Sequence, residues 1–134
     1  MNTGGTQIWQ GACHCHRTRF TITADIDHSR ICDCSICHQR GALIFRAEED
    51  QFTLHTSLSD MTLYEWGTGT AKDNFCKTCG ILPFRRPRVQ TADEAIEGLP
   101  VFSGWAINAR CLEGLDVSQL PIQHIWGSRL SLPD

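Results

Sequence analysis

Eight cysteines stand in a chain of 134 residues, and seven of them fall into three tight groups. Such a density in a small chain is typical of a disulfide framework or of a metal site. The groups are a C-x-C pair, a C-x-C-x-x-C triplet and a C-x-x-C pair: Cys13 and Cys15, then Cys32, Cys34 and Cys37, then Cys76 and Cys79. The eighth cysteine, Cys111, stands alone and is interpreted as a lone buried thiol.

The beginning of the chain bears on whether these thiols are reduced. Residues 1–7 have neither the basic start nor the apolar run of a secretory signal. No stretch approaches the roughly 20 apolar residues that a membrane span needs. We therefore expect a cytoplasmic protein with no membrane partner, whose cysteines bind metal rather than form disulfides.

The cysteine spacings indicate how the sulfurs are presented. Residues two apart in a strand point to the same face, so a C-x-C pair can offer two sulfurs to one ion. A C-x-x-C pair followed by a glycine, here Gly80, is typical of a zinc knuckle. A structural zinc takes four ligands, and seven cysteines make four plus three. The arithmetic predicts one closed site and one site with an open position.

The spacing leaves the grouping open between two arrangements. One joins the two pairs and leaves the triplet intact: Cys13, Cys15, Cys76 and Cys79. The other combines two cysteines of the triplet with the C-x-x-C pair and leaves Cys32 without a metal: Cys34, Cys37, Cys76 and Cys79. The first is favoured because it wastes no ligand. A histidine as fourth ligand of the triplet is a further alternative, the candidates being His14, His16, His28 and His38. Iron–sulfur clusters also use cysteine sets, but the knuckle glycine favours zinc.

Short alternating stretches dominate the rest of the chain and predict an all-β fold. Residues 17–26 alternate apolar and polar side chains as a half-buried strand does. Further strands are expected at 43–45, 51–55, 61–66, 81–85 and 101–107, with a turn at 67–69 and short helices at 35–40 and 91–97. The length and the lack of repeats or linkers predict a single domain over 1–134, with its core at about 7–127.

The charges are scattered and sum to −3. A nucleic-acid partner is not expected, since such proteins usually carry a basic stripe. The nearest feature is the run of Arg85, Arg86 and Arg88, interrupted by a proline. We interpret it as a solvated turn, the alternative being a contact to one anionic substrate group.

The order of these motifs resembles the glutathione-dependent formaldehyde-activating enzyme (GFA) family, which includes centromere protein V. The matching pieces are Gly11-Ala12-Cys13-His14-Cys15, Arg19-Phe20, Cys32-Asp33-Cys34-Ser35-Ile36-Cys37 and Phe75-Cys76-Lys77-Thr78-Cys79-Gly80. Residues 108–116 and His124-Ile125-Trp126 are similar to the family's closing elements. The resemblance spans nearly the whole chain.

The resemblance implies a zinc-supported fold of several coiled antiparallel sheets, shared with methionine-R-sulfoxide reductases and called Mss-four-like. It implies two Zn²⁺ ions per chain. The structural ion would be held by the two pairs, and the catalytic-type ion by the triplet: Cys13, Cys15, Cys76 and Cys79, and Cys32, Cys34 and Cys37. The family reaction joins formaldehyde and glutathione into S-hydroxymethylglutathione, and in reverse it is a carbon–sulfur lyase reaction.

Three hypotheses of function concern the triplet. The leading one is a zinc-dependent enzyme acting on a thiol and its aldehyde adduct, with glutathione the first candidate, because three thiolates leave a coordination position for a substrate thiol. His38, next to Cys37, is the candidate general base. The alternative is a non-catalytic module with two structural zinc sites. The third is a redox protein that cycles a disulfide within the triplet. A homo-oligomer is compatible with each of them.

Overall fold

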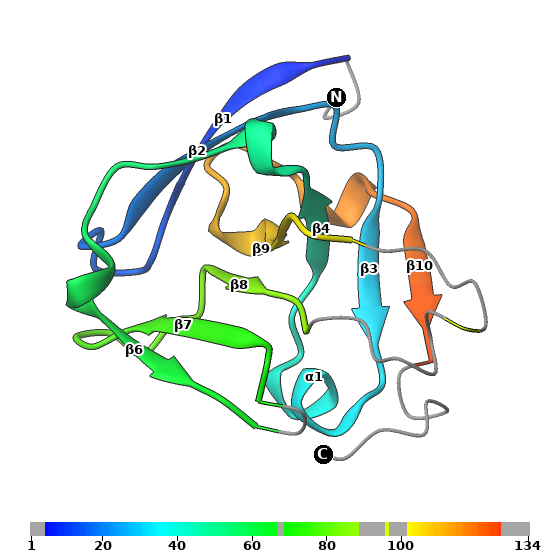
Figure 1. Cartoon of the computed structure of the whole chain (residues 1–134). Coiled ribbons are helices and arrows are strands. Elements are labelled where there is room, and N and C mark those ends of the chain that lie inside the picture. The colour runs from blue at the N-terminus through cyan, green and yellow to red at the C-terminus, as the bar shows by residue number, and fades with distance from the viewer. Residues whose placement is uncertain (1–4, 67–68, 89–95, 97–101, 127–134) are drawn as a thin grey trace.

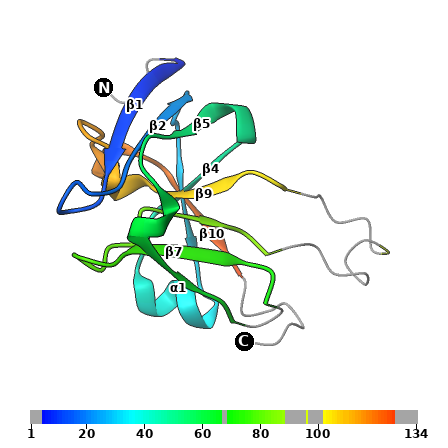
Figure 2. The same cartoon turned by 60° about the vertical axis from the view of Figure 1, so that its left-hand side comes forward.

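The computed structural model describes residues 5–66, 69–88, 96 and 102–126. Within them lie two β-sheets and one α-helix, so the predicted all-β class is confirmed. The smaller sheet has the order β1-β2-β5, with β1 at Gln7–Ala12, β2 at Arg19–Ala24 and β5 at Phe52–Leu54. Figure 1 shows this sheet crossing one side of the larger sheet, and Figure 2 shows the helix on the opposite side of the molecule.

The larger sheet has seven strands in the order β10-β3-β4-β9-β8-β7-β6. Their bounds are Ser29–Cys32 for β3, Ile44–Ala47 for β4, Met61–Tyr64 for β6, Lys72–Cys76 for β7, Phe84–Arg86 for β8, Trp105–Asn108 for β9 and Ile122–Ile125 for β10. The helix α1 spans Ser35–Arg40. Short 3-10 turns lie at Glu49–Gln51, Leu58–Asp60, Ala109–Cys111 and Val117–Gln119.

One strand pair departs from the expected antiparallel arrangement. β10 runs parallel to β3, with Ile125 opposite Cys32, whereas the other strand pairs of the described chain are antiparallel. The amide of Asp33 continues this pairing by donating to the carbonyl of Ile125 at 3.1 Å. The segment near the carboxyl end therefore supports the strand that carries the first cysteine of the triplet.

An aromatic core joins the two sheets. Phe20 packs against Phe84 with ring centroids 5.6 Å apart, and Phe52 stacks on Trp105 at 4.4 Å. Phe20 and Phe84 are fully buried. Such pairs combine a large apolar area with favourable ring geometry, so this cluster fixes the smaller sheet on the larger one.

The larger sheet has two chemically different faces, because successive side chains of a strand alternate. The core face carries Phe45 and Ala47 on β4 and Ile107 on β9, all of them buried. Arg46 lies between Phe45 and Ala47, and Ala106 directly precedes Ile107, so both project to the other face. In Figure 1, α1 lies near the lower ends of β3 and β7, and its Arg40 contacts Asp73, which lies opposite Arg85 on this second face.

Some of the helices and strands predicted from the sequence are observed at the expected residues, and others are shifted. The helix over 35–40 is confirmed as α1, and the expected strands at 17–26, 51–55 and 61–66 each contain an observed strand. The strand expected at 43–45 overlaps β4, which continues to Ala47. The strand expected at 81–85 is shifted to β8, and only the end of the one at 101–107 is seen, as β9. The helix at 91–97, apart from residue 96, and most of the turn at 67–69 lie outside the described residues. Among the residues that the structure describes, no helix has the length and apolar character needed to cross a bilayer.

Candidate metal centres

Four sulfurs meet where the two sheets join. Cys13 and Cys15 come from the turn after β1, whereas Cys76 is the last residue of β7 and Cys79 lies in the turn that follows. Their Sγ atoms all lie within 4.8 Å of one another, with 3.7 Å between Cys13 and Cys15 and 3.6 Å between Cys15 and Cys76. A disulfide needs about 2.05 Å, so these thiols are separate. The edge of a tetrahedron with Zn–S bonds of about 2.3 Å is roughly 3.8 Å, so the spacing suits a tetrahedral four-sulfur site.

Both halves of this quartet are built as knuckles. The Thr18 amide donates to the Sγ of Cys13, and the Thr78 amide to the Sγ of Cys76, each at 3.4 Å. The tight reversals need a left-handed residue, which is His16 at φ +66° in the first and Gly80 at φ +79° in the second. Amides aimed at sulfur favour the thiolate, which is the form that binds metal.

The electrostatics of the quartet follow from these contacts. Burial alone would raise the pKa of Cys13, but the Thr18 amide and the thiols of Cys15 and Cys76 outweigh it, and the pKa is lowered. Burial likewise opposes the lowering at Cys79, where amide donors led by Ile81 bring the pKa to about 6. At Cys15 the Arg17 amide lowers the pKa, but burial and the neighbouring thiols outweigh it and raise the pKa to about 11. Thiolate character at neutral pH is therefore strongest at Cys79.

The triplet lies at the junction of β3 and α1. Cys32 ends the strand, Cys34 is the residue before the first helical one, and Cys37 is one turn into the helix. Their sulfurs also lie within 4.8 Å of one another, and the amide of Cys34 donates to the Sγ of Cys32 at 3.5 Å. All three are half-buried. Within the described chain no further histidine, cysteine or carboxylate joins the group.

The three sulfurs of the triplet cannot all ionise side by side. The hydrogen bond with Cys32 raises the pKa of Cys37 far above its ordinary value, and burial and Cys34 raise it further. A nearby divalent cation reverses such a shift, since coordinating thiols are deprotonated. The donor set thus fits a soft metal ion such as zinc, with three protein ligands from the described residues. The two clusters can hold metal ions, in the first of the two groupings that the spacing left open.

The histidines considered as ligands lie elsewhere. His14 and His16 are exposed beside the quartet, and His16 is 4.0 Å from the carboxylate of Glu113. His28 contacts Asp27 at 2.7 Å and lowers the pKa of that carboxyl. His38 lies on the exposed side of α1. None of them joins either sulfur cluster.

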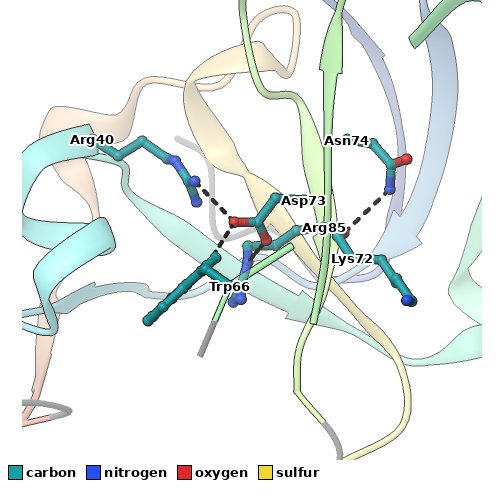
Figure 3. Close-up of polar contacts among 6 residues, drawn as sticks. All are labelled: Arg40, Trp66, Lys72, Asp73, Asn74 and Arg85. Atoms are coloured by element: carbon teal, nitrogen blue, oxygen red, sulfur yellow. Dashed lines mark hydrogen bonds and ion pairs between the residues drawn. The ribbon is translucent and has the colours of Figure 1, made fainter. Parts of the chain in front are cut away.

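A buried carboxylate fastens α1 to the sheet (Figure 3). Asp73 on β7 has no exposed surface, and it accepts hydrogen bonds from Arg40 of α1 at 3.0 Å, from Arg85 of β8, and from the Trp66 indole at 3.3 Å. Arg40 is one helical turn from Cys37, so the contact fixes the helix that carries the third sulfur. No local pattern in the sequence marks Asp73 as buried, so this network could not be predicted from the sequence.

The arginine run is not a solvated turn. Arg85 and Arg86 lie in strand β8, where Arg85 pairs with Asp73. Arg86 pairs with Glu49, which lowers the pKa of that carboxyl, and its guanidinium lies 3.7 Å from the centroid of the Trp105 ring. The turn prediction is wrong because the alternation continues to Arg86 before the proline interrupts it.

Cys111 is separate from both clusters. It is half-buried against the core, and it is a free thiol like the other seven cysteines. Burial, followed by the nearby charges of Cys13 and Cys79, raises its pKa to about 11. Such a thiol stays protonated at neutral pH and is unreactive.

The fold and the two clusters define a small all-β protein with one four-sulfur and one three-sulfur site. Comparison with known proteins makes the assignment specific. The family model of the glutathione-dependent formaldehyde-activating enzyme matches residues 8–102, and the chain belongs to this family. The crystal structure of a Rhodobacter sphaeroides protein is similar, with a TM-score of 0.68 and 29% identity over 85% of this chain and 99% of that one. The family resemblance inferred from the motifs is therefore confirmed.

Proposed function

We propose that this protein is a zinc-dependent enzyme of the carbon–sulfur lyase type, which joins glutathione or another thiol to formaldehyde and reverses that reaction. The observation that carries the proposal is the contrast between the clusters. The quartet offers a complete tetrahedral set, whereas the triplet offers three sulfurs and no further described ligand. Catalytic zinc sites commonly keep a position for substrate in this way.

The ligand assignment is part of the proposal. Cys13, Cys15, Cys76 and Cys79 would hold a structural zinc, and Cys32, Cys34 and Cys37 a catalytic-type zinc. When bound at the triplet, zinc would supply Lewis acidity and a coordination position at which a thiol loses its proton. The family assignment supports glutathione and formaldehyde as the small-molecule partners. We further propose a single cytoplasmic domain.

The chain's own residues would position the reactants. The sulfurs of Cys32, Cys34 and Cys37 lie together at the carboxyl end of β3. The salt bridge between Arg40 and Asp73 keeps α1 in place. In the forward reaction a carbon–sulfur bond forms between the thiol sulfur and the formaldehyde carbon. The thiol proton is transferred to the carbonyl oxygen, and the reverse reaction breaks the same bond. We propose His38, on the exposed side of α1, as the group that carries this proton.

The reaction is tested by exchange spectroscopy, because thiols and formaldehyde also combine without an enzyme. ¹³C-formaldehyde and glutathione are mixed with zinc-loaded protein, and the exchange rate between free aldehyde and adduct is measured by NMR. We expect a clear acceleration with the wild type and with Cys111→Ser, and none with Cys34→Ser. No acceleration by a wild type that binds two zinc ions would favour the non-catalytic alternative.

A further inference from the structure

The face of the larger sheet that holds Cys32 also carries three arginines. Residues opposite each other in a sheet project to the same side. Arg46 on β4 and Arg85 on β8 both lie opposite Ala106 of β9. Arg30 on β3 lies opposite Ile44, which is two residues before Arg46 on β4. We call Arg30, Arg46 and Arg85 the arginine face; Arg46 and Arg85 flank Ala106, and Arg30 lies one strand beyond Arg46.

These arginines stand close together although their charges repel. Arg30 and Arg46 are diagonal neighbours on paired strands, which places their Cα atoms roughly 7–8 Å apart. A small side chain at Ala106 leaves the arms of Arg46 and Arg85 without a bulky residue between them.

Only one of the three has an acidic partner in the described chain. Arg85 is neutralised by Asp73, which also serves Arg40. Within the described residues, no carboxylate forms an ion pair with Arg30 or Arg46. The Arg46 guanidinium lies 4.7 Å from the centroid of the Phe102 ring, which orients it, and its side chain is exposed. Arg46 is therefore oriented, accessible and without an acidic partner among the residues that the structure describes.

The arginine face lies within reach of the triplet. Cys32 is two residues beyond Arg30 on β3, about 7 Å along the strand, and points to the same side. A tripeptide extends about 10 Å, so a thiol at the triplet and a carboxylate at these guanidiniums can belong to one small peptide.

We propose that the arginine face, with Arg46 and Arg30 as its principal donors, binds a carboxylate of the thiol substrate. Arginine suits this role because its planar fork matches a carboxylate in two parallel hydrogen bonds. The inference rests on the proposed function and narrows it: the substrates are thiols that carry a carboxylate, and neutral thiols of similar size bind less tightly. The competing explanation is that these arginines only balance the negative charge of three thiolates.

The test uses ligands whose sulfur is capped, so that carboxylate recognition is measured apart from thiol binding. Zinc-loaded protein is titrated calorimetrically with S-methylglutathione and with its diethyl ester, which lacks both carboxylates. We expect the wild type to bind the acid at least tenfold more tightly than the ester. Arg46→Ala should weaken binding of the acid about ten- to a hundredfold, as expected for a lost charge-assisted contact, and leave the ester unchanged.

Two further variants sharpen the result. Arg46→Lys keeps the positive charge but lacks the planar guanidinium that forms two parallel hydrogen bonds. Its affinity for S-methylglutathione should lie between those of the wild type and Arg46→Ala. Arg19→Ala removes an exposed arginine from the smaller sheet and should bind both ligands as the wild type does. Circular dichroism of each variant verifies that it is folded, which is expected because both side chains are exposed.

The outcomes separate this inference from the proposed function. Equal binding of acid and ester, equal losses of both in Arg46→Ala, or no measurable binding of the acid would overturn the carboxylate site. If the protein gives any of these binding results but still accelerates formaldehyde exchange, the carboxylate site is wrong and the proposed function is retained. Arg46-dependent binding of the acid by a protein that accelerates no exchange supports the carboxylate site and removes the proposed reaction.

Discussion

Replacement of Asp73 by asparagine removes the charge that fastens α1 to the sheet. Asp73 is fully buried and accepts from Arg40, Arg85 and Trp66. Asparagine has nearly the same shape, but one of its two side-chain oxygens becomes an NH₂ group. The NH₂ group cannot accept a hydrogen bond from an arginine, and its own hydrogens face the guanidinium that the carboxylate oxygen had bound. The variant therefore leaves two guanidiniums without a counter-ion.

The magnitude follows from the burial of the three side chains. Breaking a buried ion pair from one side costs about 3–5 kcal/mol, because the remaining charge is uncompensated. Asp73 has 0% exposed side-chain surface, whereas Arg40 and Arg85 retain 18% and 13% and can partly reach water. We therefore expect the lower end of the range, a loss of about 3 kcal/mol in the free energy of unfolding.

Urea unfolding at a fixed excess of zinc measures this loss. With a slope of about 1.5–2 kcal/mol per molar urea, the midpoint should fall by about 1.5–2 M. Glu65→Gln is the matched control. Glu65 pairs with Lys72, the residue before Asp73, but both side chains of this ion pair are about 40% exposed. The control should lose less than about 1 kcal/mol. If the two variants unfold at the same midpoint, the anchoring role assigned to Asp73 is wrong.

Three further substitutions test other parts of the structure. Cys76→Ser removes a quartet ligand, and since structural zinc contributes on the order of 10 kcal/mol, circular dichroism should show an unfolded chain; a folded variant would contradict the structural role. Gly80→Ala places a side chain at φ +79° with open space around it, so thermal unfolding should report only backbone strain, about 1–2 kcal/mol. Gly11→Ala sets a methyl group 2.3 Å from the Phe20 ring, and denaturant unfolding should show a loss of about 1–3 kcal/mol; no loss would mean that the ring moves freely.

The sequence predicted best where apolar residues alternate over a long enough stretch. Residues 17–26 gave β2 because Phe20, Ile22 and Ala24 all face the core. β1 was missed because its pattern is weak. Ile8 is 68% exposed, and the buried position of Gly11 has no side chain, because the Phe20 ring fills that space.

Long-range pairing limited the rest of the prediction. β10 is exposed along most of its length and pairs in parallel with a strand about ninety residues earlier in the chain, and no local pattern encodes either property. The cysteine groups were visible in the sequence, yet the choice of partners needed the turns after β1 and β7 to be placed together. The buried position of Asp73 and the neighbourhood of Arg46 depend likewise on strands that meet only in the folded sheet.

The central claim is that the four sulfurs form a closed site and the three sulfurs an open one. Zinc bound per chain, measured by elemental analysis of wild type and Cys34→Ser with X-ray absorption at the zinc edge, tests it most directly. We predict two zinc ions in the wild type, one of them with an exchangeable fourth ligand, and one fully sulfur-ligated ion in the folded variant. A single zinc in the wild type, or a second zinc with four permanent protein ligands, would contradict the account.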